Sequence, residues 1–319
     1  MPQTFSPIDL NAVKTYNLSD RKSKVTAEDF AKTWQKGASY RTFLDNLPSI
    51  LAGNQLKSVI AAIVKAYRHN HTILFGMGAH VIKVGLNPIV IDLMERRLIT
   101  GVAMNGAGII HDVELAMVGR TSEDVAAALD DGSFGMARET CTFLSEAIAS
   151  AREKSTGLGA AVGRTILDKR LPLMEKSILA AGARLGIPVT VHVAIGTDIL
   201  HMHPGFDPQA TGAATHLDFR LFSAIVATLD KGVYLNVGSA VILPELFLKA
   251  TTLVRNLGYT LEDFTTVNLD FIKHYRPLTN VVNRPTAKGG CGINLVGHHE
   301  ILIPLIAAGV IEEIDSAVP

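Results

Sequence analysis

Short apolar runs and helical apolar stripes alternate through the first half of the chain. Residues 72–75 and 101–104 are apolar runs of strand length, and each leads into a turn rich in small residues. Between them, apolar residues recur with the period of a helix that buries one face. Asn87 followed by Pro88 is a typical helix start, with the asparagine as the cap. The pattern of residues 71–108 therefore predicts a strand, a turn, a helix, a second strand and a second turn, with the two strands parallel.

The same alternation continues toward the C-terminus. Further helical patterns cover residues 56–64, 178–185, 222–229 and 244–257, and further strand patterns cover residues 189–195, 233–237 and 264–269. Helices that alternate with short apolar strands are typical of a doubly wound, mostly parallel sheet with helices on both faces. We expect a single α/β domain over residues 1–319. Residues 1–50 are expected to form a mostly helical N-terminal extension, with Thr26 and Asp29 at one helix start, and residues 121–169 a helical excursion.

Composition narrows the class of protein. The 319 residues are 48% hydrophobic and 19% charged, with a formal net charge of +0, so nothing indicates binding to nucleic acid or to an anionic membrane. Neither an apolar leader nor a membrane-spanning run is visible, which predicts a cytoplasmic protein. The two cysteines, Cys141 and Cys291, form no disulfide framework.

The carboxyl ends of the predicted strands carry the candidate binding residues. Glycines let a backbone approach a phosphate or ribose closely, and ligands of open α/β sheets bind at this edge. Asp198 is able to accept the hydroxyls of a ribose, whereas Gly76-x-Gly78 is not the full dinucleotide fingerprint, since the sixth position is Val81. The alternative is that these glycines only make tight turns. We predict a nucleotide site, with NAD as the cofactor, formed by Gly76, Gly78, Ala79, His80, Asn105, Gly106, Ala107, Gly108, Thr197, Asp198, Gly238, Ser239 and Ala240.

The order of these motifs resembles deoxyhypusine synthase. The first unit of that family is matched without a gap by Thr72-Ile73-x-x-Gly76, Val81-Ile82, Gly85-Leu86 and Gly106-Ala107-Gly108-x-x-His111-Asp112. Looser matches follow in order at Ile187-Pro188-Val189, Thr197-Asp198, Leu235-x-x-Gly238-Ser239-Ala240-Val241 and Arg284-Pro285. The resemblance implies an NAD-dependent α/β enzyme, a homotetramer, that oxidises a polyamine and transfers its aminobutyl group through an active-site lysine.

The sequence departs from that family where the reaction takes place. The family's Trp-Gly-Lys motif is replaced by Thr286-Ala287-Lys288-Gly289-Gly290, and the single tryptophan is Trp34. We therefore expect an NAD-binding enzyme that acts on a small amine of the polyamine type by dehydrogenation or transfer, as a homo-oligomer. The alternatives are an NAD-consuming or metal-assisted hydrolase on the same fold, and a nucleotide-binding protein without catalysis.

Four residues are the catalytic candidates, and each has a second interpretation. Lys288 is either a nucleophile in a glycine-rich loop or a solvated surface lysine. His111 and Asp112 form either an acid–base pair or a helix cap, and Glu245 after Pro244 is either an amine contact or a cap. Asp270 is a further carboxylate expected near the site. His192, His201 and His203 suggest a metal site, but no recognised ligand motif accompanies them, so no metal is predicted.

Overall fold

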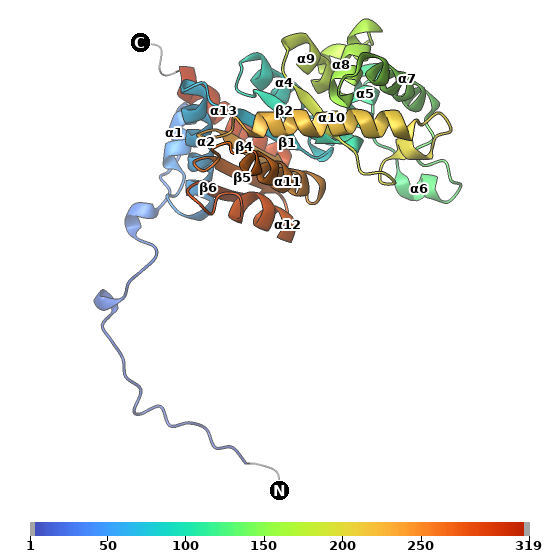
Figure 1. Ribbon diagram of the computed structural model, residues 1–319. Helices are drawn as coiled ribbons and strands as arrows, with labels where there is room; N and C mark the ends of the chain where they lie inside the picture. Colours follow the sequence, from blue (N-terminus) through green and yellow to red (C-terminus); the bar gives the residue numbers. More distant parts are fainter. Residues whose placement is uncertain (1–3, 316–319) are drawn as a thin grey trace.

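Six parallel strands form the centre of the molecule (Figure 1). The computed structural model describes residues 4–315. The strand order is β3-β2-β1-β4-β5-β6, so the chain winds outward from β1 to one edge, returns to β4 beside β1 and continues to the other edge. This confirms the predicted doubly wound α/β fold. The strands are β1 (Ile73–Met77), β2 (Gly101–Asn105), β3 (Val189–His192), β4 (Val233–Val237), β5 (Thr265–Asp270) and β6 (Cys291–Val296).

Helices cover both faces of this sheet (Figure 1). Side chains of α2 and α13 pack on one face, and those of α10 and α11 on the other. The long connection from β2 to β3 builds a helical layer of its own with α5 to α9. The helices are α1 (Tyr40–Asn46), α2 (Leu51–Arg68), α3 (His80–Lys83), α4 (Asn87–Glu95), α5 (Gly106–Val118), α6 (Val125–Leu129), α7 (Arg138–Lys154), α8 (Leu158–Asp168), α9 (Ile178–Leu185), α10 (Pro208–Val226), α11 (Ile242–Asn256), α12 (Tyr275–Pro277) and α13 (His299–Asp315). Shorter 3-10 turns are η1 (Leu18–Asp20), η2 (Ala27–Asp29), η3 (Met174–Lys176) and η4 (Ile199–Met202), and η5 (Leu278–Asn283) is a π-helix.

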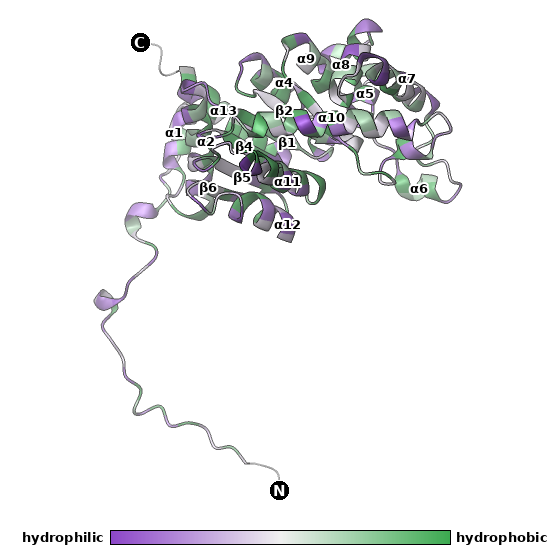
Figure 2. Ribbon diagram, in the orientation of Figure 1, coloured by the Kyte–Doolittle hydropathy of each residue, from purple (hydrophilic) through white to green (hydrophobic). Residues whose placement is uncertain are grey.

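The two central strands are buried along their whole length because both faces of the sheet are covered. All five residues of β1 and of β4 are buried, which is the pattern of a central parallel strand. Figure 2 shows the corresponding distribution, with hydrophobic residues in the strands and hydrophilic residues on the outer helices. The core thus fixes the sheet as a rigid frame for the loops at its ends.

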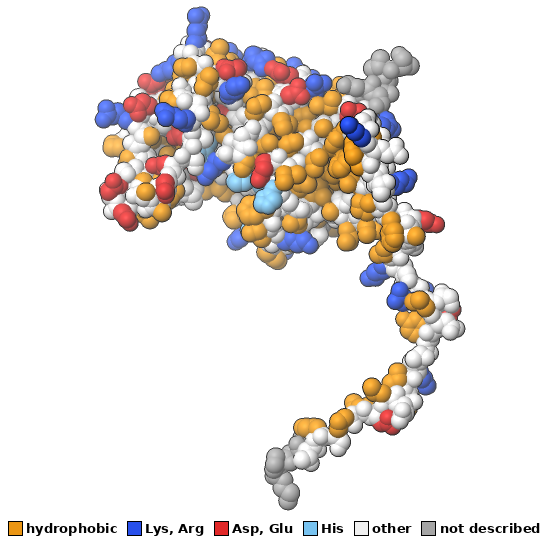
Figure 3. Space-filling model, turned by 180° about the vertical axis from the view of Figure 1, so that it is seen from behind, with side chains coloured by type: hydrophobic (Ala, Val, Ile, Leu, Met, Phe, Trp, Pro, Cys, Tyr) orange, Lys and Arg blue, Asp and Glu red, His pale blue; other side chains and the backbone are white. Residues whose placement is uncertain are grey.

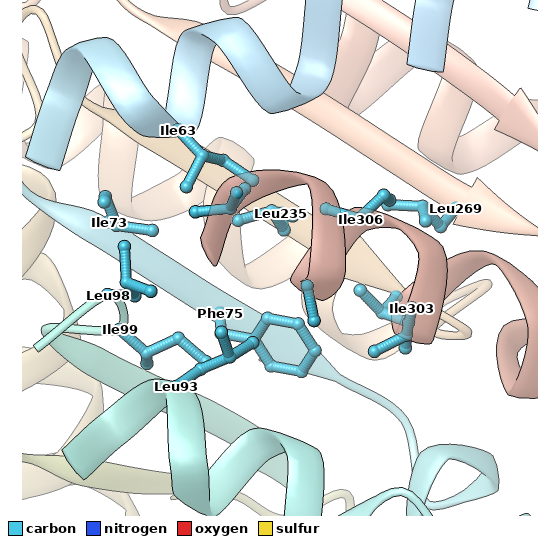
Figure 4. Close-up of a pocket in the computed structure, with 13 residues that line it drawn as sticks. Ile63, Ile73, Phe75, Leu93, Leu98, Ile99, Leu235, Leu269, Ile303 and Ile306 are labelled. Atoms are coloured by element: carbon cyan, nitrogen blue, oxygen red, sulfur yellow. The ribbon is translucent and has the colours of Figure 1, made fainter. Parts of the chain in front are cut away.

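A small gap remains in the core between the sheet and the helices α2 and α13 (Figure 4). Phe75 of β1 faces Ile63 of α2 and Ile303 of α13 around a cavity of about 30 Å³. All 13 lining residues are apolar, so a water molecule there would lack hydrogen-bond partners. This gap is an imperfection of packing and not a ligand site.

Side chains of α10 form hydrogen bonds to the outward backbone groups of the edge strand β3. The hydroxyl of Thr215 donates to Val191 O (2.8 Å) and accepts from Val193 N (3.1 Å). Asp218 Oδ2 accepts from Val191 N and from Gly159 N at the start of α8, each at 2.9 Å. The outward backbone groups of Val191 and the N–H of Val193 are therefore bonded, and this part of the β3 edge is not open to pairing with another strand.

Three local features differ from the sequence prediction. Residues 4–39 contain only two short 3-10 turns, one of them with the expected capping box of Thr26 and Asp29, and this segment extends away from the body (Figure 1). Its apolar side chains are exposed, so no packing stabilises a helix there. Strand β3 stops at His192. Asn87 does not cap α4, because its buried amide instead donates to Asp112 and to Lys176 O.

Within residues 4–315, no helix is both long enough and apolar enough to cross a lipid bilayer.

Candidate functional site

The switch point of the sheet lies between β1 and β4, where the connections leave in opposite directions. The backbones that follow these two strands touch there. Gly78 N donates to Val237 O (2.8 Å), and a Cβ on Gly78 would overlap the carbonyl oxygen of Gly238. Gly238 also has a φ of +63°. Both positions therefore require glycine, and the contact divides the carboxyl edge of the sheet into two sides.

On the side of β2 and β3 there is a cavity of about 720 Å³. Three of the predicted cofactor residues, Ala107, Thr197 and Asp198, line this cavity, and so does the predicted catalytic residue His111. The sequence did not single out the remaining charged residues of its wall, since they are common surface types in a helix or loop. These are Lys83, Glu114, Arg120 and Glu123.

Asp198 is a carboxylate residue in the wall of this cavity, and one of its oxygens is covered by the start of α5. Its Oδ2 is buried and has no hydrogen-bond partner among the described residues. A Cβ on Gly106 would overlap that oxygen, so the loop after β3 packs directly against the start of α5. Burial raises the pKa of Asp198, and His201 nearby acts in the opposite direction.

His201 holds the Asp198 loop in shape. Its Nδ1 accepts from Gly196 N (3.1 Å) and Asp198 N (3.2 Å). The other two histidines of this region point elsewhere, since His192 is buried against Thr190 (2.9 Å) and His203 contacts Gly135 O (3.1 Å). The described residues contain no group of three or more His, Cys, Asp or Glu side chains arranged to hold a metal ion.

His111 is held as a neutral imidazole at the cavity wall. The hydroxyl of Thr121 donates its only hydrogen to Glu114, so it must accept the bond from His111 Nδ1 (2.6 Å). The Nε2 atom is therefore the acceptor nitrogen of His111. Burial and, second, the charge of Lys83 lower the pKa of His111 to about 4.

Asp112, next in the chain, is turned away from the cavity and is fully buried. Its oxygens accept from Ser177 Oγ (2.5 Å), Ile178 N (2.9 Å), Leu179 N (3.2 Å) and the amide of Asn87 (3.0 Å). Burial raises its pKa to about 6, although these bonds oppose the shift. Asp112 lies inside α5 and accepts from the first backbone N–H groups of α9, whose N-cap is Ser177. This differs from the cap of its own helix start that the sequence suggested as the alternative.

Several predicted cofactor residues are occupied by the fold itself. Asn105 caps α5 by accepting from Gly108 N (3.1 Å), and Ser239 accepts from Leu243 N (3.2 Å) at the start of α11. Gly76 lies inside β1, where it makes room for the ring of Tyr234. Ala79 and Ala240 are half-buried beside the switch point.

The structure does not bring Lys288 and Glu245 to the cavity. Lys288 is exposed in the turn before β6. That turn lies at the amino ends of the strands, opposite the carboxyl edge, and there Cys291 N donates to Phe264 O (3.0 Å). Glu245 sits on α11, bonded to Lys249 and Asn280, beside a groove that α10 and α11 line. For Lys288 the reason is topological, because residues before a parallel strand lie at its amino end. Glu245 follows β4, but it lines a different groove from the cavity.

On the side of β5 and β6 lies a group of rings that we call the histidine cluster: His80, Phe271, His298 and His299. His80 follows β1, Phe271 follows β5, and the other two precede and begin α13. The ring centre of His80 lies 5.4 Å from that of His299 and 6.0 Å from that of Phe271. The sequence signals were the single residue His80 and the pair His298-His299, but nothing in the sequence showed that they meet.

Comparison with known proteins supports the fold and does not identify a family. No family model and no curated protein matches the sequence. Among solved structures, AgrE in a ternary complex with ornithine and NAD+ is 12% identical over 84% of this chain, with a TM-score of 0.55. This chain spans only 34% of AgrE. The LOR/SDH protein of Methanococcus maripaludis S2 is 12% identical over 88% of this chain and 72% of its own, with a TM-score of 0.50.

A putative deoxyhypusine synthase from Entamoeba histolytica also matches, at 12% identity over 88% of this chain and 96% of its own, with a TM-score of 0.49. At such identities the likeness concerns the fold alone.

Proposed function

We propose that this protein binds NAD or a closely related nucleotide at the carboxyl edge of its sheet, with a ribose on Asp198. The observation that carries this proposal is the carboxylate residue Asp198 in the wall of a 720 Å³ cavity, with one oxygen that has no hydrogen-bond partner among the described residues. Ribose hydroxyls are donors that a carboxylate accepts, and an acidic residue has this role in doubly wound nucleotide-binding folds.

The surrounding residues suit such a ligand. Ala107 lies in the first turn of α5 and lines the cavity, so free backbone N–H groups of this helix are available to a phosphate. The neutral Nε2 of His111 is an acceptor for an amino group of the ligand. The published complex of AgrE with NAD+ on a similar fold agrees with this choice of nucleotide.

We further propose that the protein is an enzyme that uses the nucleotide on a small amine, by dehydrogenation or transfer. The sequence resemblance to deoxyhypusine synthase supports the amine. The bound nucleotide would supply the hydride acceptor, and the protein would hold the ribose through Asp198 and shield the ligand within the helical layer of α5 to α9.

Calorimetric titration with NAD tests the binding. We expect saturable binding by the wild-type protein and a loss of about tenfold or more for Asp198→Ala, since hydrogen bonds to a charged group contribute roughly 1.5–3 kcal/mol. Asp92→Ala is the matched control, because Asp92 is an exposed carboxylate that pairs with Arg96 on α4. Wild-type protein that binds no NAD at millimolar concentration would overturn the proposal.

Enzyme activity is tested separately, by following NADH formation with a panel of diamines and polyamines. Turnover with any of them supports the amine proposal. Binding of NAD without turnover across the panel would instead indicate a nucleotide-binding protein that does not catalyse this reaction.

A further inference from the structure

Phe271 is an aromatic side chain that the core does not use. It follows β5 directly, is 47% exposed, and has Ile272 beside it at 50%. Its ring lies between those of His80 and His298, at 6.0 and 6.3 Å between ring centres, and it is nearly parallel to His298. Figure 3 shows histidine side chains at the surface next to hydrophobic ones. An exposed ring at the ligand-binding edge of the sheet offers a flat surface for stacking.

His299, the buried histidine of the cluster, is neutral and has one ring nitrogen without a hydrogen-bond partner among the described residues. His299 Nε2 lies 3.2 Å from Leu269 O, and because a carbonyl oxygen only accepts, Nε2 carries the hydrogen. Nδ1 then has a lone pair, yet it is buried and lacks a partner among the described residues. His299 is 0% exposed, and its ring covers Gly238 at the switch point.

His80 is the less buried of the two histidines His80 and His299, whose rings are in contact. It is half-buried, stands edge-on to His299, and makes no hydrogen bond to another described residue. The ring nitrogens of His80 are therefore polar groups available beside the ring of Phe271. A planar ring with hydrogen-bonding substituents fits this combination.

The two sides of the switch point thus suit the two halves of a dinucleotide. The cavity side offers a carboxylate for a ribose and a helix N-terminus for a phosphate, whereas the histidine cluster offers ring faces and imidazole nitrogens. The small residues Gly78 and Gly238 lie between them. A dinucleotide that spans a switch point places one half on each side.

We propose that the nicotinamide half of NAD, and with it the substrate, binds against Phe271 and His80, and that the adenosine half binds in the cavity. This inference rests on the proposed binding of NAD. It assigns the histidine cluster as the subsite of the reacting ring.

Titration with two probes, NAD and ADP-ribose, tests the orientation. ADP-ribose lacks the nicotinamide ring, so Phe271→Ala should weaken NAD about fivefold and leave ADP-ribose unchanged. Asp198→Ala should weaken both probes. Leu257→Ala, an exposed apolar residue after α11, is the control and should change neither.

Histidine ring signals in NMR spectra give a second measurement. We expect the signals of His80 and His299 to shift with NAD and not with ADP-ribose. Equal weakening of both probes by Phe271→Ala, or His80 shifts with ADP-ribose, would overturn the orientation. If the wild-type protein binds neither probe, the proposed function itself fails, which is a distinguishable result.

Discussion

The cavity side and the histidine-cluster side of the same sheet edge differ in chemistry because their connections differ in length. The connection from β2 to β3 contains α5 to α9 and encloses a cavity whose walls hold charged groups. The connection from β5 to β6 contains only α12 and η5, and it leaves Phe271 exposed. One parallel sheet therefore presents an enclosed polar site and an open aromatic site within a single edge.

Each side also holds a histidine that burial keeps neutral. The pKa of His111 is lowered by burial and then by Lys83. The pKa of His299 is lowered by burial, while its bond to Leu269 O and the carboxylate of Asp270 act in the opposite direction. The charged group beside each histidine is thus different, Lys83 for His111 and Asp270 for His299.

The largest expected effect is structural and concerns Asp112. Asp112→Ala removes the acceptor for four buried donors, which should lower the free energy of unfolding by about 3 kcal/mol or more. Denaturant unfolding measures this change. Asp112→Asn should lower the free energy of unfolding by less. An Asp112→Ala variant that is as stable as the wild type but no longer turns over substrate would contradict this structural role and indicate a catalytic one.

A methyl group at Gly106 should damage the cavity side alone. Gly106→Ala places a Cβ against Asp198 Oδ2, so we expect NAD affinity to fall about tenfold as the carboxylate is displaced. Gly212→Ala is the matched control, since Gly212 lies in α10 with no atom within 4 Å of the added Cβ. It should stabilise the helix by about 1 kcal/mol. Unchanged NAD affinity in Gly106→Ala would contradict the assignment of Asp198.

The third prediction concerns the proton on His111. Its folded-state pKa of about 4 lies below the ordinary 6.5, so protonation favours the unfolded chain, and this contribution to stability is lost as the pH falls from about 6.5 toward 4. Lys83→Gln should raise the pKa of His111 and reduce that loss. An NMR titration of the ring signals follows the pKa directly. No change in Lys83→Gln would mean that the charge of Lys83 does not act on His111.

The smallest expected effect is that of Lys288→Ala. Lys288 is exposed at the opposite edge of the sheet, so NAD affinity and any turnover should stay at the wild-type level and stability within about 0.5 kcal/mol. Lost turnover with intact folding would show that Lys288 reaches a site after all, for instance in an oligomer.

Sequence patterns predicted the frame well because they report local physics. The apolar runs of β1, β2 and β4 and the helical pattern of residues 178–185 are visible in the sequence and present in the structure. The positions of the candidate site residues were predicted only in part. Ala107, Thr197, Asp198 and His111 do line one cavity, whereas Asn105 and Ser239 cap helices. Asparagine and serine at such positions are as typical of a helix cap as of a ligand contact, so the sequence did not distinguish the two roles.

By itself, the sequence determined the alternation of strands and helices and hence the doubly wound parallel sheet, because hydrophobic period and parallel connections decide both. Only the tertiary structure decided which of the polar residues at that edge face one another. Asp198 meets Gly106, and His80 meets His299, across stretches of chain that no local pattern spans. The same packing sent Asp112 into the core and Lys288 to the opposite edge, since the burial of a side chain depends on every element around it.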